Sequence, residues 1–291
     1  MTTENQKSWS QNLSVFLDRR NVTMLFLGFS AGIPILMIFS SLSLWLREAG
    51  VERSAVTFFS WAALGYSFKF VWAPLVDKLP LPLLTKMFGR RRSWMLFSQS
   101  MIVLAICGMA LVDPQQSQNA LTYMAIAAVL LGFSSATQDI VIDAYRIESA
   151  PDDLQAILSS TYIAGYRIAM LVSGAGALFL ADYFGSTKES SSYDAWKWTY
   201  LIMAATMLVG MITTLMRPEP ENKKHREENH DAADYARFFG LFLLIAGTFV
   251  AVFFLSADLT SSIKASLTET FNNKHLAGFI VGTLRLIIAG S

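Results

Sequence analysis

Long apolar runs separated by short polar segments dominate the chain. Each of the first six runs is close to the roughly 20 residues that a helix needs to cross the hydrocarbon core of a bilayer. The runs are near-continuous rather than alternating, which excludes a membrane β-barrel, and only helices and closed barrels pair every backbone group in lipid. The pattern therefore predicts six transmembrane helices, at about 22–45, 55–76, 94–112, 120–143, 157–181 and 197–216.

Polar segments divide the chain further. After the sixth run comes a linker with two prolines and a run of charges, then a seventh apolar run and the start of an eighth, which no polar segment closes before Ser291. We therefore expect a chain that stops inside a helix. The predicted parts are a cytoplasmic N-terminal tail (1–21), a six-helix transporter half (22–216), a charged cytoplasmic linker (217–237), and a seventh and partial eighth helix (238–291).

Composition and charge support a membrane protein. Hydrophobic residues make up 53% of the chain and charged residues only 15%, against about 25% charged in soluble domains. Of the 23 Lys and Arg residues, 14 fall in segments on the side of the N-terminus and six on the other side. Because cytoplasmic loops hold the excess of positive charge, the N-terminus and the linker are predicted to be cytoplasmic. A net charge of +1 without a basic face argues against nucleic acid as a partner.

A first candidate site lies between the second and third predicted helices. Asp77 ends the second helix, and the basic cluster Arg90, Arg91 and Arg92 follows Gly89. A charge-assisted network between them, joined by Arg146, would latch the cytoplasmic face and bias one transport state against another. The alternative is that the arginines only set the membrane topology.

A second candidate site lies within the membrane. Asp139 and Asp143 are four residues apart, so they share one helix face. Carboxylates at that depth normally face the bundle interior or a water-filled cavity, where they could bind and release a proton. Arg167 and Lys69 are the cations inside neighbouring apolar runs, and Arg167 is predicted to pair with Asp139 or to bind an anionic substrate group. The alternative is a static ion pair that holds helices together.

No enzyme motif is recognisable. The three histidines are not at metal-ligand spacing, and no Gly-rich phosphate loop followed by Lys-Ser or Lys-Thr occurs. We therefore expect no catalytic residues, metal or cofactor, and transport driven by an ion gradient rather than by ATP.

Three motifs give the chain a family resemblance. They are Lys69-Phe-Val-Trp-Ala-Pro-Leu-Val-Asp77, Gly89-Arg-Arg-Arg-Ser-Trp94 and above all Gln138-Asp-Ile-Val-Ile-Asp-Ala-Tyr-Arg146. The chain resembles AmpG-type muropeptide permeases of the major facilitator superfamily, and more distantly acetyl-CoA transporters. The resemblance implies an all-α polytopic bundle, comprising the N-terminal half of a major-facilitator fold plus about two further helices, truncated at the C-terminal side.

The same resemblance implies a function. It predicts a symporter in the bacterial inner membrane that imports anhydromuropeptides together with protons, as part of peptidoglycan recycling. It also implies that Gln138, Asp139 and Asp143, which match a hallmark motif of the family, are functional residues. Two alternatives stay open. One is a related carrier of another peptide, sugar or coenzyme-A ester. The other is a fragment that does not transport, because a cavity between two halves would be incomplete.

Overall fold

The structure is a computed structural model that describes residues 18–52, 59, 62–187, 190–220, 232–271 and 274–290. It divides into two compact units, Met1–Arg226 and Glu227–Ser291. Every regular element in the described residues is helical. This confirms the predicted all-α, polytopic bundle.

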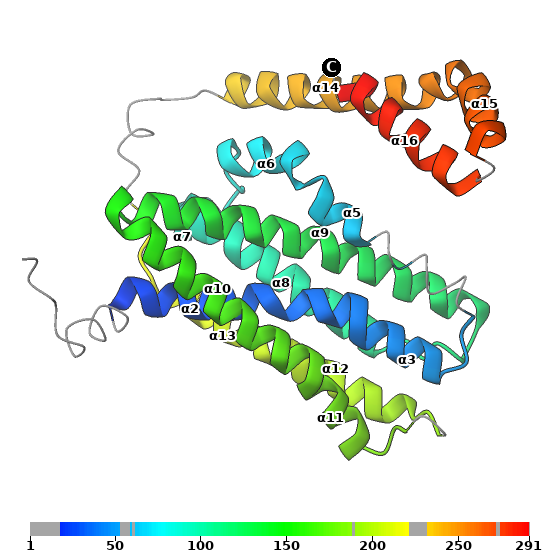
Figure 1. Ribbon diagram of the computed structural model, residues 1–291. Helices are drawn as coiled ribbons and strands as arrows, with labels where there is room; N and C mark the ends of the chain where they lie inside the picture. The colour runs from blue at the N-terminus through cyan, green and yellow to red at the C-terminus, as the bar shows by residue number, and fades with distance from the viewer. Residues whose placement is uncertain are drawn as a thin grey trace, which may run out of the picture. The chain divides into compact units, whose positions relative to one another are not determined.

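The first unit consists of long helices joined by short connections (Figure 1). Its main elements in chain order are α2 (Arg19–Leu36), η1 (Met37–Ser41), α3 (Leu42–Glu48), α5 (Ala62–Ser67), α6 (Lys69–Lys78), α7 (Leu84–Phe88), α8 (Arg90–Ala110), α9 (Gln118–Ser149), η3 (Asp152–Leu154), α10 (Gln155–Leu171), η4 (Val172–Gly176), α11 (Ala177–Tyr183), α12 (Tyr193–Thr206) and α13 (Leu208–Met216).

Five stretches of the described residues are helical, long and apolar enough to cross a membrane. They are Arg19–Glu48, Arg90–Ala110, Asn119–Ser149, Asp152–Tyr183 and Tyr193–Met216. They contain most of the first, third, fourth, fifth and sixth predicted helices. The second predicted helix differs, because α5 and α6 are separated at Phe68, whose backbone leaves the helical region at φ −103° and ψ 10°.

α8 and α9 are among the helices that extend further than predicted, and each does so at an end that carries charges. α8 begins at Arg90, four residues before the predicted start, and α9 continues to Ser149, six residues beyond the predicted end. Hydropathy marks where the apolar run stops, but a helix continues as long as its backbone groups are paired. The latch arginines therefore lie in the first turn of a helix instead of in a loop.

α2 and α10 run side by side and pack at backbone distance. A Cβ atom added at Gly28 would collide with the carbonyl oxygen of Tyr162, and one added at Gly165 would collide with that of Leu25. The Gly28 and Gly32 spacing in the first helix thus permits close packing, as small residues do in membrane bundles. The glycine on the facing helix is Gly165, whereas the small-residue run 173–177 lies in and beside η4.

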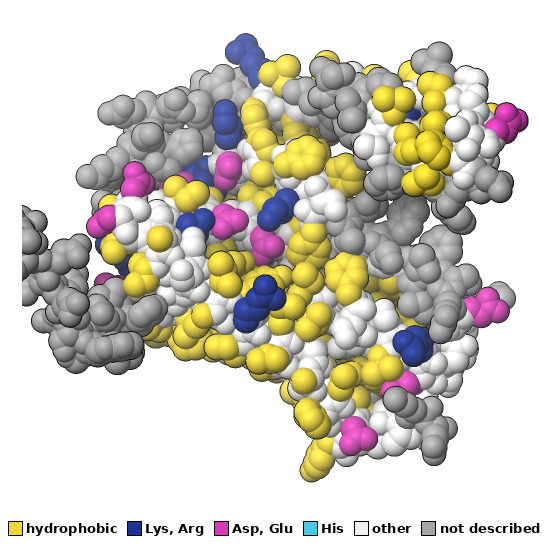
Figure 2. Space-filling view, in the orientation of Figure 1, with side chains coloured by type: hydrophobic (Ala, Val, Ile, Leu, Met, Phe, Trp, Pro, Cys, Tyr) yellow, Lys and Arg dark blue, Asp and Glu magenta, His cyan; other side chains and the backbone are white. Residues whose placement is uncertain are grey.

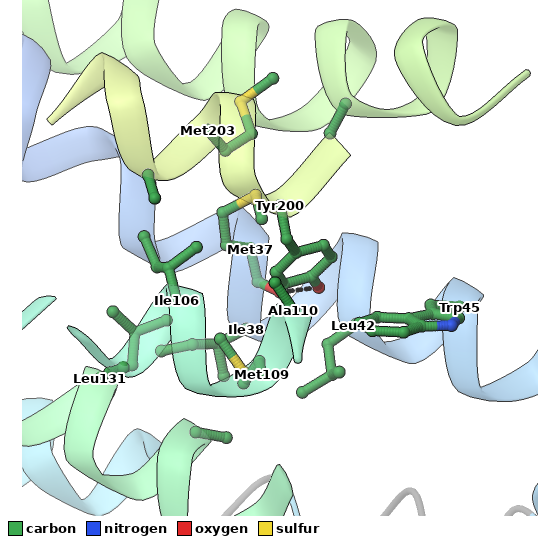
Figure 3. Close-up of a cluster of buried hydrophobic side chains, with 14 of the residues drawn as sticks. Met37, Ile38, Leu42, Trp45, Ile106, Met109, Ala110, Leu131, Tyr200 and Met203 are labelled. Carbon is green, nitrogen blue, oxygen red and sulfur yellow. Dashed lines mark hydrogen bonds between the residues drawn. The ribbon is translucent and has the colours of Figure 1, made fainter. Parts of the chain in front are cut away.

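A hydrophobic core gathers where α2, η1 and α3 meet α8, α9 and α12. Figure 3 shows side chains of the first helix, including Met37 and Trp45, facing Ile106 of α8, Leu131 of α9 and Tyr200 of α12. Apolar packing of this kind supplies dispersion contacts that do not depend on water.

The core also stabilises a break in the first helix. Pro34 lies within α2, and the π-helical segment η1 follows it. The Tyr200 hydroxyl donates a hydrogen bond of 3.0 Å to the Met37 carbonyl, and Ser41 donates one of 3.0 Å to the Ser173 carbonyl in η4, the second π segment. Neighbouring hydroxyls thus bind carbonyl groups in the widened turns.

The second unit contains α14 (Ala232–Leu259), α15 (Ser261–Phe271) and α16 (Lys274–Gly290). α14 includes the predicted seventh helix, and α16 includes the start of the predicted eighth. α15 is a helix in a segment predicted to be a loop. Within this unit, Arg285 of α16 donates a 3.3 Å hydrogen bond to the Ser256 hydroxyl of α14.

Candidate functional site

Asp139 lies in α9 and is half-buried. The Tyr162 hydroxyl of α10 donates to its Oδ1 atom over 3.3 Å. The carboxylate also interacts electrostatically with Lys69 of α6 and with Asp143, one turn further along α9. Three of the residues predicted to handle protons or substrate are thus brought into one electrostatic cluster.

Aromatic side chains that were not predicted as site residues surround this cluster. Tyr162 and Tyr166 lie one turn apart on α10, with ring centroids 6.1 Å apart. The Trp72 ring lies 5.0 Å from that of Phe133, and the Tyr66 hydroxyl bonds Ser135 over 2.8 Å. The four-residue spacing of the two tyrosines was a usable signal, because residues at i and i+4 share a helix face.

Gln138 points away from Asp139. Its side chain is fully buried, and its amide nitrogen donates a 2.7 Å hydrogen bond to the Ser30 hydroxyl of α2. Adjacent residues of a helix differ by about 100° in direction, so two neighbours in one motif reach different surroundings. Gln138 packs inside the six-helix unit, whereas Asp139 lies on the side of α6 and α10.

Arg167 has a different environment from the one predicted. Its side chain is exposed, and its Nη1 atom lies 3.6 Å from the sulfur of Met170. In the described part of the chain no carboxylate lies within 4.0 Å of its guanidinium, and Tyr162 takes the place beside Asp139 that was predicted for Arg167. The guanidinium is therefore available to an anionic group from outside the bundle.

Arg146 is tied to the membrane cluster and not to the latch arginines. Its guanidinium lies 3.4 Å from Asp143 and donates a 3.0 Å hydrogen bond to Gln155 at the start of α10. The prediction that Arg146 joins the latch is therefore wrong. Arg146 pairs with Asp143 instead, because the i,i+3 spacing on α9 brings these two side chains together.

The latch forms around Arg91, which is buried. Its guanidinium lies 2.7 Å from Asp77 of α6 and 2.6 Å from Glu148 of α9. Arg90 lies 3.7 Å from the same glutamate. One arginine thus connects three helices by charge-assisted bonds, which are about twice as strong as neutral ones. Glu148 was not predicted, because it lies beyond the expected end of its helix.

Arg92 serves another partner. Its guanidinium donates hydrogen bonds of 3.0 and 2.8 Å to the carbonyls of Thr214 and Leu215 at the end of α13. The three arginines predicted to surround Asp77 therefore have different partners. Arg91 bonds Asp77, Arg90 lies beside Glu148, and Arg92 binds backbone carbonyls at a helix C-terminus.

Charged side chains lie within an otherwise hydrophobic surface over α9 and α10 (Figure 2). Asp143 and Arg167 are exposed on these two helices. Ionisable residues within membrane helices face a bundle interior or an aqueous cavity rather than lipid, because lipid does not solvate charge. The arrangement therefore defines this surface as one that meets water, a ligand or further protein.

Comparison with known proteins places the chain in a family. The family model described as Major Facilitator Superfamily matches residues 24–291. The chain is 39% identical over 207 residues to the putative transporter AmpG 4 of Rickettsia felis, a match that covers 71% of this chain and 47% of that protein. It is 32% identical over 278 residues to the anhydromuropeptide permease of Escherichia coli K12, a match that covers 96% of this chain and 53% of that protein.

The chain therefore belongs to the major facilitator superfamily, a class of multi-pass membrane transporters. Within that class its relatives are AmpG proteins, which confirms the resemblance seen in the sequence motifs. The family is one of transporters and not of enzymes, in agreement with the sequence motifs. The chain spans about half the length of the curated relatives that it matches.

Proposed function

We propose that the protein imports anhydromuropeptides across the bacterial inner membrane and couples their uptake to protons. The observation that carries this proposal is the cluster around Asp139 of α9, whose carboxylate accepts a 3.3 Å hydrogen bond from Tyr162 and interacts electrostatically with Asp143 and Lys69. Such groups are costly in lipid and mark substrate or proton pathways.

Asp139 is the proposed proton site. Its neighbours act in opposite directions. Lys69 stabilises the charged form of the Asp139 carboxyl group, whereas the nearby Asp143 carboxylate stabilises its neutral form. The Tyr162 hydroxyl bonds either form. A change in distance to Lys69 between two transporter states would therefore change proton affinity, which is what coupling requires.

The proposed substrate follows from the E. coli relative, whose name states an anhydromuropeptide permease. Muropeptides are sugar-peptide fragments that carry carboxylates. The exposed guanidinium of Arg167 suits a carboxylate, since its planar fork donates hydrogen bonds to both oxygens at once. The rings of Trp72 and Phe133, 5.0 Å apart, offer apolar faces on α6 and α9.

We also propose the predicted orientation and division of the chain. The excess of Lys and Arg supports a cytoplasmic N-terminus and linker. Residues 22–216 would form one transporter half, and 238–291 would belong to the part of the protein that lies after the linker. Tagging the N-terminus and the connection at 184–192 with a cysteine tests this. An impermeant thiol reagent added from outside should label only the 184–192 site in intact spheroplasts.

The test of function is uptake of a radiolabelled anhydromuropeptide by the intact protein in proteoliposomes with an inward proton gradient. We expect the Asp139→Asn variant to insert normally and to lose uptake, because an amide cannot carry the proton. The Asp153→Asn variant is the matched control, since Asp153 is exposed in η3. Uptake at the wild-type rate by Asp139→Asn across about pH 5–8, on both sides of neutral, contradicts the proton site.

The substrate is tested separately. Unlabelled sugars, peptides and coenzyme-A esters compete with the labelled muropeptide in the same vesicles. Competition by the muropeptide alone supports the proposal. Stronger competition by another compound class would instead identify a related carrier, with the proton site unaffected.

A further inference from the structure

The segment that leaves α13 folds back onto the start of α8. The Glu219 carboxylate accepts hydrogen bonds of 2.6 Å from the Arg91 backbone N–H and 3.0 Å from that of Arg92, one through each oxygen. The first four N–H groups of a helix have no partner within it. A carboxylate from a distant part of the chain therefore caps this helix, where its negative charge is also favoured by the helix dipole.

Gly89 makes this approach possible. Its φ angle is +87°, a region that residues with a Cβ atom rarely adopt. A Cβ atom there would also lie 2.5 Å from the carboxyl carbon of Glu219. The glycine of the Gly-Arg-Arg-Arg motif thus provides both the turn into α8 and the space that the linker carboxylate occupies.

The attachment is reciprocal. While Glu219 caps the N-terminus of α8, Arg92 of α8 donates to the last carbonyls of α13. A further bond, of 3.3 Å, runs from the Tyr145 hydroxyl to the Pro218 carbonyl. The segment also borders a cavity of about 490 Å³, which Arg19, Arg20 and Thr23 help to line. The start of the linker is therefore held from the side of α8 and α9.

The same residue, Arg91, belongs to this attachment and to the latch. Its backbone N–H is held by Glu219, while its guanidinium bridges Asp77 and Glu148. A guanidinium meets two carboxylates at once only if its helix turn is fixed, because both bonds are directional.

We propose that Glu219 is a positioning residue for the cytoplasmic latch. It fixes the first turn of α8, so that Arg91 reaches Asp77 and Glu148 together, and it thereby ties the latch to the segment that leads out of the six-helix unit. A displacement of this segment loosens the latch. The effect on transport rests on the proposed function, whereas the attachment itself does not.

Hydrogen exchange of the intact protein in detergent tests the attachment without any transport assay. Glu219→Ala removes both acceptors, and we expect exchange at the Arg91 and Arg92 amides to become at least about tenfold faster, since bonds to charged groups are the stronger ones. Glu219→Gln keeps one acceptor and should restore part of the protection. Asp153→Ala is the control, because Asp153 is an exposed carboxylate of η3, and it should leave both amides protected.

The Leu111 amide provides an internal control, because it bonds the Cys107 carbonyl at the other end of α8 over 3.0 Å. Its protection shows that a variant is folded. Unchanged exchange at Arg91 and Arg92 in a folded Glu219→Ala variant overturns the proposal. So does an equal acceleration of exchange in the Asp153→Ala variant.

Uptake then separates the two proposals. With Glu219→Ala we expect a several-fold lower maximal rate and an unchanged KM, because the start of α8 does not touch the proposed substrate surface. A changed KM with an unchanged maximal rate would contradict a role in the latch. If the wild-type protein takes up no muropeptide, the proposed function fails, while the exchange result still decides the role of Glu219.

Discussion

Substitution of Gly165 by alanine tests whether backbone contact between α2 and α10 holds the first unit together. Gly165 is buried in the middle of α10. An added Cβ atom would collide with the Leu25 carbonyl oxygen, and it would lie 2.9 Å from the carbonyl carbon of that residue and 3.0 Å from the Phe29 nitrogen. Backbone atoms cannot rotate out of the way as a side chain does. The two helices must therefore separate.

The expected cost follows from two opposing effects. Overpacking of a well-packed core costs about 1–3 kcal/mol, and a collision with backbone belongs to the upper part of that range. Alanine in a helix interior regains about 1 kcal/mol over glycine. The net loss of about 1–2 kcal/mol corresponds to a fall in Tm of about 2–8 °C for a protein of this size.

Thermal unfolding in detergent, followed by circular dichroism, measures the effect. Gly108→Ala is the matched control, because Gly108 also lies in a long helix and a Cβ atom there would meet only the Ala127 Cβ at an ordinary 3.6 Å. That variant should be as stable as the wild type or slightly more so. Equal Tm values for the two variants would refute the reasoning, because the helical gain is the same and only the collision differs.

Two further variants address the latch and the helix break. Asp77→Asn removes the charge that meets Arg91 at 2.7 Å; uptake should slow with an unchanged substrate preference, and a new preference in a competition assay would argue against a latch. Tyr200→Phe removes the hydrogen bond to the Met37 carbonyl; Tm should fall by the equivalent of about 1 kcal/mol, and an unchanged Tm would mean that packing alone supports η1.

Much of the candidate site was visible in the sequence because its signals are local. Asp139 and Asp143 stand out as charges within an apolar run, and the Arg90–Arg92 cluster stands out beside Gly89. Hydropathy over about 20 residues and the 3.6-residue helical period are properties of neighbouring positions. They determined the helices, the class of protein and the depth of the carboxylates.

Partners were decided by packing. Arg91 bonds Glu148, which lies 57 residues away in the sequence, and Glu219, which lies 128 residues away. Nothing in the sequence distinguishes these two acids from the other glutamates of the chain. Arg167 was paired with Asp139 by reasoning from charge alone, whereas the structure brings Tyr162 to that carboxylate.

The neighbours Gln138 and Asp139 show the same division. In the sequence they form one motif, and in the structure Gln138 bonds Ser30 inside the bundle, while Asp139 lies beside Lys69 and Tyr162. The sequence by itself determined that a polar pair lies at membrane depth. Only the tertiary structure decided which of the two faces the proposed pathway, because the rotation of α9 depends on its packing against other helices, including the close contact of Gly132 with the Ala62 backbone of α5.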